Sequence, residues 1–183
     1  MNLFELKILD FLKEHLTCGF LDFLMPLITK LGDGGIFWII VALILLITKK
    51  YRKVGAMMGV ALVLGLILGN GILKNVVGRI RPYDLNPEIK DMLLIEALSD
   101  KSFPSGHTLA SFESAVVLLI NDKRLGIPAI VLASLIAFSR LYLYVHYPTD
   151  VLASIILGTA FAFLAKYIVE KAIKIYSQKR LSK

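Results

Sequence analysis

Residues 125–145 read LGIPAIVLASLIAFSRLYLYV, a stretch of 21 residues in which Arg140 is the only charged side chain. About 20 apolar residues in helical conformation are enough to cross the hydrocarbon core of a bilayer. A helix also satisfies its own backbone hydrogen bonds, which an open chain in lipid requires. The stretch therefore predicts a membrane-spanning helix that contains an arginine.

Four further apolar stretches predict an all-α fold, a polytopic membrane helix bundle with about five transmembrane spans. They cover about 35–48, 54–73, the segment from after Pro104 to about 120, and 149–167. Residues 3–16 place apolar and charged side chains at helical spacing, which predicts an amphipathic helix at the interface. Residues 20–31 are too short to cross alone, so we expect a re-entrant or interfacial helix there.

The composition agrees with a membrane protein of one domain. The chain has 183 residues, of which 57% are hydrophobic, whereas soluble domains average about 45–50%. Its net charge is +7, but membrane topology explains the clustered basic residues better than nucleic-acid binding does. Cys18 is the single cysteine, which excludes an internal disulfide. We expect one domain over 1–183, with interfacial helices at 1–33, a transmembrane core at 34–168 and a basic cytoplasmic tail at 169–183.

The lysine and arginine residues between the predicted spans indicate the orientation, because cytoplasmic loops are enriched in them. They gather after the first, third and fifth spans, at 49–53, 123–124 and 166–183. These segments fall on one side, which we expect to be cytoplasmic. The N-terminus, the 74–104 connection and the turn near 146–149 are then expected on the outer face. The N-terminal sequence does not resemble a cleaved signal peptide.

Three cations are predicted on that outer face. Lys74 ends the second span, and Arg81 follows seven residues later, about two helical turns, so both can share one helix face. Pro82 disfavours helix at Arg81, where the helix is expected to end. Arg140 lies inside its span, where an arginine is costly and by default marks function. Such cations predict a site for a phosphoryl dianion.

Two polar segments mark the starts of other spans. In Pro104–Ser105–Gly106–His107, Ser105 is a good N-cap and Gly106 lets a ligand approach free helix amides. His146 and Asp150 are four residues apart, so the carboxylate can hold the imidazole in one tautomer. A capped helix start and a polar turn are the alternatives for each segment alone. The presence of both on one face favours a single site.

The three segments together resemble the signature of the type 2 phosphatidic acid phosphatases. These are integral-membrane lipid phosphate phosphatases of a superfamily that includes the vanadium haloperoxidases. The similarity covers residues 74–150 and consists of K-x6-RP, PSGH and SR-x5-H-x3-D in that order. Three spaced motifs in the right order are far more specific than any one of them.

The resemblance implies a role for each residue. His146 attacks phosphorus and forms a transient phosphohistidine, Asp150 orients and activates it, and His107 protonates the leaving oxygen and then assists water. The phosphoryl oxygens are held by Lys74, Arg81, Arg140, Ser105 and Gly106. The family needs no metal, so no metal and no other cofactor is expected.

The expected function is metal-independent hydrolysis of the terminal phosphate of a membrane lipid. Undecaprenyl diphosphate, phosphatidylglycerol phosphate and phosphatidic acid are candidate substrates, with a diphosphate lipid slightly favoured. The expected partners are this lipid and the bilayer, without nucleic acid. The alternative is a small anion-conducting or lipid-binding membrane protein without catalysis. Haloperoxidase activity is remote, because known members are soluble and much larger.

Two features remain outside the motifs. Glu113 follows His107 by six residues and points to a different helix face. We expect it to pair with a polar group such as Asn70 or to face a cavity, without a catalytic role. Residues 91–98 favour a short helix that lies on the membrane and covers the bundle, with a lipid gate as the alternative.

Overall fold

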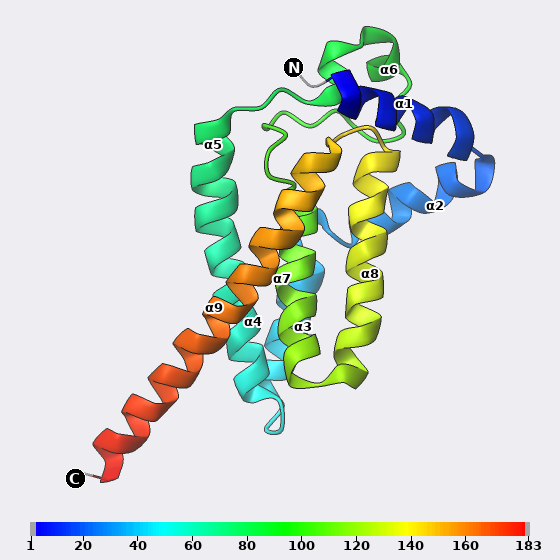
Figure 1. Cartoon of the computed structure of the whole chain (residues 1–183). Coiled ribbons are helices and arrows are strands. Elements are labelled where there is room, and N and C mark those ends of the chain that lie inside the picture. The colour runs from blue at the N-terminus through cyan, green and yellow to red at the C-terminus, as the bar shows by residue number, and fades with distance from the viewer. Residues whose placement is uncertain (1–2, 182–183) are drawn as a thin grey trace.

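The computed structural model describes residues 3–181, which are helical or irregular throughout (Figure 1). Residues 1–2 of the predicted interfacial segment and 182–183 of the predicted tail lie outside this range. The elements are, in chain order, α1 (Leu3–Leu16), α2 (Gly19–Lys30), η1 (Asp33–Gly35), α3 (Ile36–Ile47), α4 (Arg52–Leu64), η2 (Gly65–Leu73), α5 (Lys74–Val77), η3 (Pro82–Leu85), α6 (Pro87–Asp91), α7 (Gly106–Asn121), α8 (Lys123–Tyr142) and α9 (Pro148–Leu181).

The all-α bundle is confirmed, but a count of five spans is not established. Within the described residues, three helices are long and apolar enough to cross a membrane, Arg52–Leu85, Lys123–Tyr142 and Pro148–Lys179. A fourth candidate is the pair Gly19–Lys30 and Asp33–Ile47, which is bent by 41°. The predicted third span corresponds to α7, which has only 16 residues. It can be short because its neighbours bury most of it.

Helix α7 forms the centre of the bundle and packs against α4, α8 and α9. Ala115 and Val117 of α7 meet Ala133 of α8 and Ala162 of α9 in one apolar core. A Cβ on Gly158 of α9 would lie 2.9 Å from the Glu113 backbone nitrogen. Small side chains at these contacts let the helix backbones approach closely, as is typical of membrane helix pairs.

A second apolar core lies at the end of the bundle where α1 crosses it (Figure 1). Leu9 of α1 and Met25 of α2 pack there against the turn that joins α8 to α9, which includes Val145. The Tyr144 hydroxyl donates to Asp10 Oδ1 at 2.6 Å. The predicted amphipathic helix at 3–16 therefore covers the turn that contains His146.

Two local predictions are wrong. Residues 92–98 are not helical: they form a turn, two bends and irregular chain, and Leu93 and Ile95 pack against the second core. The helix that contains Lys74 ends at Val77, where Gly78 adopts a left-handed conformation with φ of 59°. Arg81 is consequently extended and does not share a helix face with Lys74.

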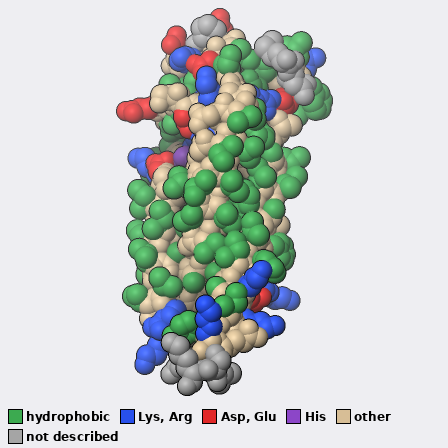
Figure 2. Space-filling model, turned by 90° about the vertical axis from the view of Figure 1, so that its left-hand side faces the viewer, with side chains coloured by type: hydrophobic (Ala, Val, Ile, Leu, Met, Phe, Trp, Pro, Cys, Tyr) green, Lys and Arg blue, Asp and Glu red, His purple; other side chains and the backbone are tan. Residues whose placement is uncertain are grey.

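The polar ends and the apolar middle of the molecule agree with a membrane position. Figure 2 shows a broad band of hydrophobic side chains between two charged ends. The α3–α4 and α7–α8 connections lie at the same end as the last turns of α9, while the turn at 143–147 lies at the other (Figure 1). Helix α9 continues without a break through 169, so the described part of the predicted basic tail is helical.

Candidate active site

His146 lies in the buried turn between α8 and α9, with 1% of its surface exposed. Its Nε2 atom is 3.3 Å from Arg81 Nη1. A guanidinium can only donate hydrogen bonds, so Nε2 presents its lone pair. The ring proton is then on Nδ1, which is 3.5 Å from Asp150 Oδ2. The contacts therefore select the tautomer in which Nε2 can act as a nucleophile.

The surroundings of His146 keep its ring neutral. Burial lowers the pKa of His146, and the positive charges of Arg140 and Arg81 lower it further, against the opposing effect of Asp150. The pKa falls from the usual 6.5 to about 3. The imidazole is therefore unprotonated at neutral pH, as a nucleophilic role of its Nε2 atom would require.

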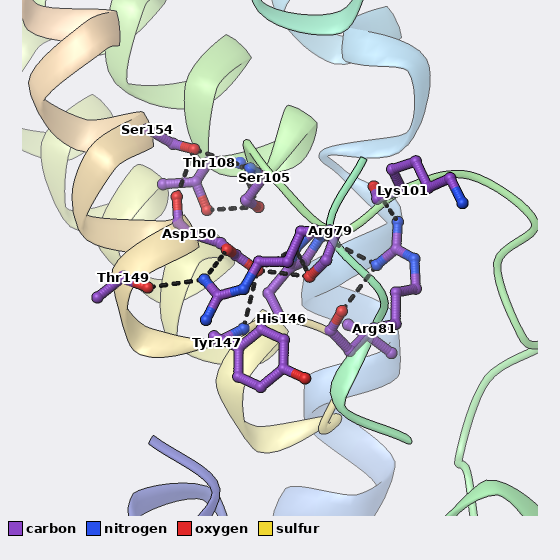
Figure 3. Close-up of polar contacts among 12 residues, drawn as sticks. Arg79, Arg81, Lys101, Ser105, Thr108, His146, Tyr147, Thr149, Asp150 and Ser154 are labelled. Carbon is purple, nitrogen blue, oxygen red and sulfur yellow. Dashed lines mark hydrogen bonds and ion pairs between the residues drawn. The ribbon is translucent and has the colours of Figure 1, made fainter. Parts of the chain in front are cut away.

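Asp150 lies in the first turn of α9 and is fully buried. Its Oδ2 atom accepts hydrogen bonds from Ser102 Oγ at 2.5 Å and from the Tyr147 amide at 3.0 Å. Its Oδ1 atom accepts from Arg79 Nη1 at 2.5 Å (Figure 3). These donors stabilise the ionised carboxylate and fix its orientation toward His146.

Arg79 was not predicted as a site residue. Its Nη2 atom lies 2.6 Å from Glu5 Oε2 of α1, and its guanidinium is 3.8 Å from the centre of the Tyr147 ring (Figure 3). Burial acts to raise the pKa of Glu5, but hydrogen bonds from Thr149 and Arg79 outweigh this effect and lower it. The sequence offers no signal for the pairing, since Glu5 and Arg79 are 74 residues apart.

Arg81 and Lys74 meet at Asp100, a residue that the sequence did not indicate. Arg81 Nη2 donates to Asp100 Oδ1 at 2.6 Å, and Lys74 forms an ion pair with Asp100 Oδ2. Burial acts to raise the pKa of Asp100, but Lys74 and Arg81 lower it to about 2. An ionised carboxylate thus binds two of the three predicted phosphate-binding cations.

Arg140 is buried, with 1% of its surface exposed, and donates through Nη1 to Thr29 Oγ1 of α2 at 2.5 Å. Its Nε and Nη2 atoms have no hydrogen-bond partner among the described residues. Unpartnered guanidinium donors in a buried site are costly. A bound anion would satisfy them, in agreement with the role predicted for Arg140.

His107 lies in the first turn of α7, and its Nε2 atom is 2.7 Å from Asp33 Oδ1. Asp33 belongs to η1, the break between α2 and α3, and was not predicted as a site residue. A Cβ on the preceding Gly32 would lie 2.6 Å from His107 Cδ2, so the ring packs directly on this backbone. The break between α2 and α3 therefore supplies both a partner and a wall for His107.

Ser105 caps α7 and is fully buried. Its Oγ atom accepts from the Thr108 amide at 3.5 Å and its own amide donates to Ser154 Oγ at 2.9 Å (Figure 3). The predicted N-cap is therefore present, and Ser105 does not line the cavity beside His146. Gly106 does line that cavity, and a Cβ on it would lie 3.0 Å from Asn70 Oδ1.

A cavity of about 730 Å³ joins these groups to an apolar region between α3, α4, η2 and α7. Its polar end includes Lys74, Arg81, His107, Arg140 and His146. Its apolar walls include Ile39, Leu43, Leu62, Val63 and Leu66. Together with Gly106, six of the predicted site residues thus face one space that also offers a path for a hydrocarbon chain.

Glu113 also lines this cavity. Facing a cavity was one of the two alternatives predicted for it, and pairing with a polar group such as Asn70 was the other. Its Oε2 atom has no hydrogen-bond partner in the described part of the chain, and neither does Asn70 Oδ1. The residues that the structure describes show no hydrogen bond between Glu113 and Asn70, so the alternative pairing is not formed. The carboxyl group packs on Gly65, where a Cβ would lie 2.3 Å from Oε2.

Comparison with known proteins identifies the arrangement. Residues 50–174 match the family model described as PAP2 superfamily. The chain is 37% identical over 150 residues to an undecaprenyl-diphosphatase of Sulfolobus acidocaldarius, covering 81% of this chain and 70% of that protein. It is 34% identical over 173 residues to phosphatidylglycerophosphatase B of Bacillus subtilis, covering 88% and 74%.

Two solved structures are similar along most of the chain. The crystal structure of Aquifex aeolicus LpxE has a TM-score of 0.76 and 27% identity, and the match covers 87% of this chain and 93% of that one. The transmembrane PAP2 type phosphatidylglycerolphosphate phosphatase of Bacillus subtilis has a TM-score of 0.72 and 28% identity, covering 91% and 85%.

Proposed function

This chain belongs to the PAP2 superfamily, and we propose that it hydrolyses the terminal phosphate of a membrane lipid through a phosphohistidine on His146. One observation supports this most strongly. The neutral His146 faces Arg81 with its Nε2 lone pair, in the same cavity where two nitrogens of Arg140 have no hydrogen-bond partner among residues 3–181. Nucleophile and anion-binding groups thus share one buried space.

In the first step, the Nε2 lone pair of His146 forms a bond to phosphorus, and the bond from phosphorus to the lipid oxygen breaks. The electron pair stays on that oxygen, which takes a proton from His107. Asp150, beside Nδ1, stabilises the positive charge that develops on the His146 ring. Arg140, Lys74 and Arg81 stabilise the charge on the transferred group, which is most of what phosphoryl transfer requires of a protein.

In the second step, water attacks the phosphohistidine. His107, now neutral, takes a proton from the water as the new oxygen–phosphorus bond forms. The phosphorus–nitrogen bond breaks, its electron pair returns to Nε2 and inorganic phosphate leaves. A covalent intermediate divides one difficult displacement into two easier ones.

The substrate is proposed to be a lipid whose head group enters the polar end of the cavity while its tail lies against Leu43, Val63 and Leu66. The apolar walls of the cavity support this placement. The printed names of relatives include both an undecaprenyl-diphosphatase and a phosphatidylglycerophosphatase. We favour a diphosphate lipid, and keep phosphatidylglycerol phosphate and phosphatidic acid as alternatives.

The site is proposed to face the extracytoplasmic side, with the C-terminus in the cytoplasm. The basic connections at 49–53 and 123–124 and the basic end of α9 lie at the end of the bundle opposite the turn between α8 and α9 (Figure 1). The positive-inside rule places such connections in the cytoplasm. We further propose that 1–183 functions as one domain, since α1 contacts the site through Glu5.

Phosphate release tests the proposal. The full chain, purified in detergent with EDTA, is expected to release phosphate from a panel of undecaprenyl diphosphate, phosphatidylglycerol phosphate and phosphatidic acid. His146→Ala is expected to abolish release while the protein stays folded. Vanadate is expected to inhibit, because it mimics five-coordinate phosphorus. Undiminished release by His146→Ala would refute the assigned nucleophile, and inactivity of the wild type on every lipid would favour a non-catalytic lipid-binding protein.

A further inference from the structure

A chain of three charged side chains connects α1 to the proposed catalytic pair. Arg79 lies between Glu5 and Asp150, at 2.6 Å from Glu5 Oε2 and 2.5 Å from Asp150 Oδ1. The two carboxylates are 4% and 0% exposed, and the Arg79 side chain is 24% exposed. Helix α1 therefore contacts the active site through charged groups and not only through its apolar face.

The carboxylate of Asp150 depends on Arg79 in a specific way. Ser102 and the Tyr147 amide both donate to Oδ2, whereas among the described residues Oδ1 accepts only from Arg79. A buried carboxylate that loses its cation is left with an uncompensated charge, which is strongly destabilising. Removing Arg79 would therefore favour rotation or protonation of Asp150.

Glu5 fixes both the cation and the helix that contains Asp150. Its Oε1 atom accepts from the Thr149 amide at 3.0 Å and from the Thr149 hydroxyl at 2.5 Å, in the first turn of α9. Its Oε2 atom accepts from Arg79, which also lies over the Tyr147 ring (Figure 3). A carboxylate at a helix N-terminus also interacts favourably with the helix dipole.

We propose that Glu5 and Arg79 are positioning residues that keep Asp150 ionised and directed at His146 Nδ1. The inference rests on the proposed function of His146 and Asp150. Helix α1 is then a part of the active site, contributed from the first turns of the chain, in addition to its position at the interface.

The expected effect is on catalysis more than on binding, because Lys74, Arg81 and Arg140 remain in place. In Arg79→Ala we expect kcat to fall about 100-fold, the size of effect that a displacement of about 1 Å can have. KM is expected to stay within about twofold. Arg79→Lys, which keeps the charge without the planar fork, is expected to fall between wild type and Arg79→Ala.

The Glu5 variants separate the ion pair from the helix cap. Glu5→Gln keeps an acceptor for Thr149 and loses the charge opposite Arg79, so we expect a fall in kcat of about tenfold. In the Arg79→Ala background the same change is expected to have less than about a twofold effect, since its path to Asp150 is already broken. Glu14→Gln, an exposed change on the same helix, is the matched control and is expected to leave kcat unchanged.

Several results would overturn the proposal. It fails if folded Arg79→Ala keeps kcat within about twofold of wild type, or if its loss lies in KM alone. It also fails if the effects of Glu5→Gln and Arg79→Ala multiply independently. If Arg79→Ala does not fold, Arg79→Lys and Glu5→Gln decide by the same criteria. Failure of the proposed function is distinguishable, because His146→Ala would then match the wild type in phosphate release.

Discussion

The contact of Asp100 with two cations predicts that this carboxylate competes with phosphate. A phosphoryl group must displace Asp100 before it can bind Lys74 and Arg81. The Asp100 side chain is 50% exposed, so each of its two ion pairs contributes only about 0.2–1 kcal/mol. Their sum, about 1.2 kcal/mol at the centre of the range, corresponds to about sevenfold in affinity. We therefore expect Asp100→Asn to bind small phosphate-like anions about sevenfold more tightly.

The variant should keep the fold, because backbone hydrogen bonds hold the segment. Arg81 Nε donates to the Asp100 carbonyl at 2.9 Å, and the Ser102 amide donates to the Arg79 carbonyl at 2.8 Å. Isothermal titration of the detergent-purified protein with orthovanadate measures the affinity directly. Asp84→Asn, which removes an exposed ion pair with Lys90 in the same connection, is the control and should leave the affinity unchanged.

Unchanged or weaker vanadate binding by Asp100→Asn would refute this reasoning. That result would mean that Asp100 organises Lys74 and Arg81 for the substrate. In the expected case, inhibition of turnover by inorganic phosphate should also become about sevenfold stronger, because Asp100 no longer competes with the product for Lys74 and Arg81.

Three further predictions concern single groups of the site. Gly32→Ala places a methyl group 2.6 Å from His107 Cδ2. We expect kcat to fall at least about tenfold in a phosphate-release assay, because the His107 ring must shift. Wild-type turnover in the folded variant would contradict the assigned position of His107. Arg140→Lys keeps a charge but cannot replace both Nε and Nη2, which lack partners among the described residues. Vanadate affinity should therefore fall at least about tenfold. An affinity equal to that of the wild type would show that these nitrogens do not bind the anion. The folded pKa of His146 is about 3, below its usual 6.5, so protonation removes the nucleophile only as the pH falls toward 3. The rate of single-turnover phosphoenzyme formation should therefore not fall when the pH is lowered through 6.5. A fall in that rate near pH 6.5 that is due to His146 would contradict a neutral, buried ring.

The sequence predicted the helices well because apolar periodicity is a local property. The amphipathic helix over 3–16 is α1 itself, and the stretch predicted at 35–48 is α3 to within one residue at each end. Gly78 could have indicated the early end of the helix at Val77, since glycine is the residue that most often follows a helix. The prediction that the helix ends at Arg81 instead rests on Pro82, four residues later. The length of α7 was harder to predict as that of a membrane helix, because the helix has only 16 residues. Its packing against α4, α8 and α9, which the sequence does not show, shields it from its surroundings.

The three motifs are also local in sequence, so the motifs and the family resemblance were enough to propose the candidate site residues His146, Asp150, His107, Lys74, Arg81 and Arg140. Their partners could not. Glu5 contacts Thr149 across 144 residues, and Arg140 contacts Thr29 across 111. Acidic residues such as Asp33 and Asp100 look like ordinary surface residues in the sequence. Only the packing of α1, η1 and the 92–105 segment against the bundle brings them to the motif residues.

The most direct test of the central claim is to trap the phosphoryl group on the protein. A radiolabelled lipid phosphate is mixed with excess enzyme, the reaction is quenched within the first turnover, and the labelled peptide is sequenced. The account predicts an acid-labile, alkali-stable label on His146 that appears and decays with phosphate release and is absent from His146→Ala. Label on another residue, or full turnover in His146→Ala, would contradict it.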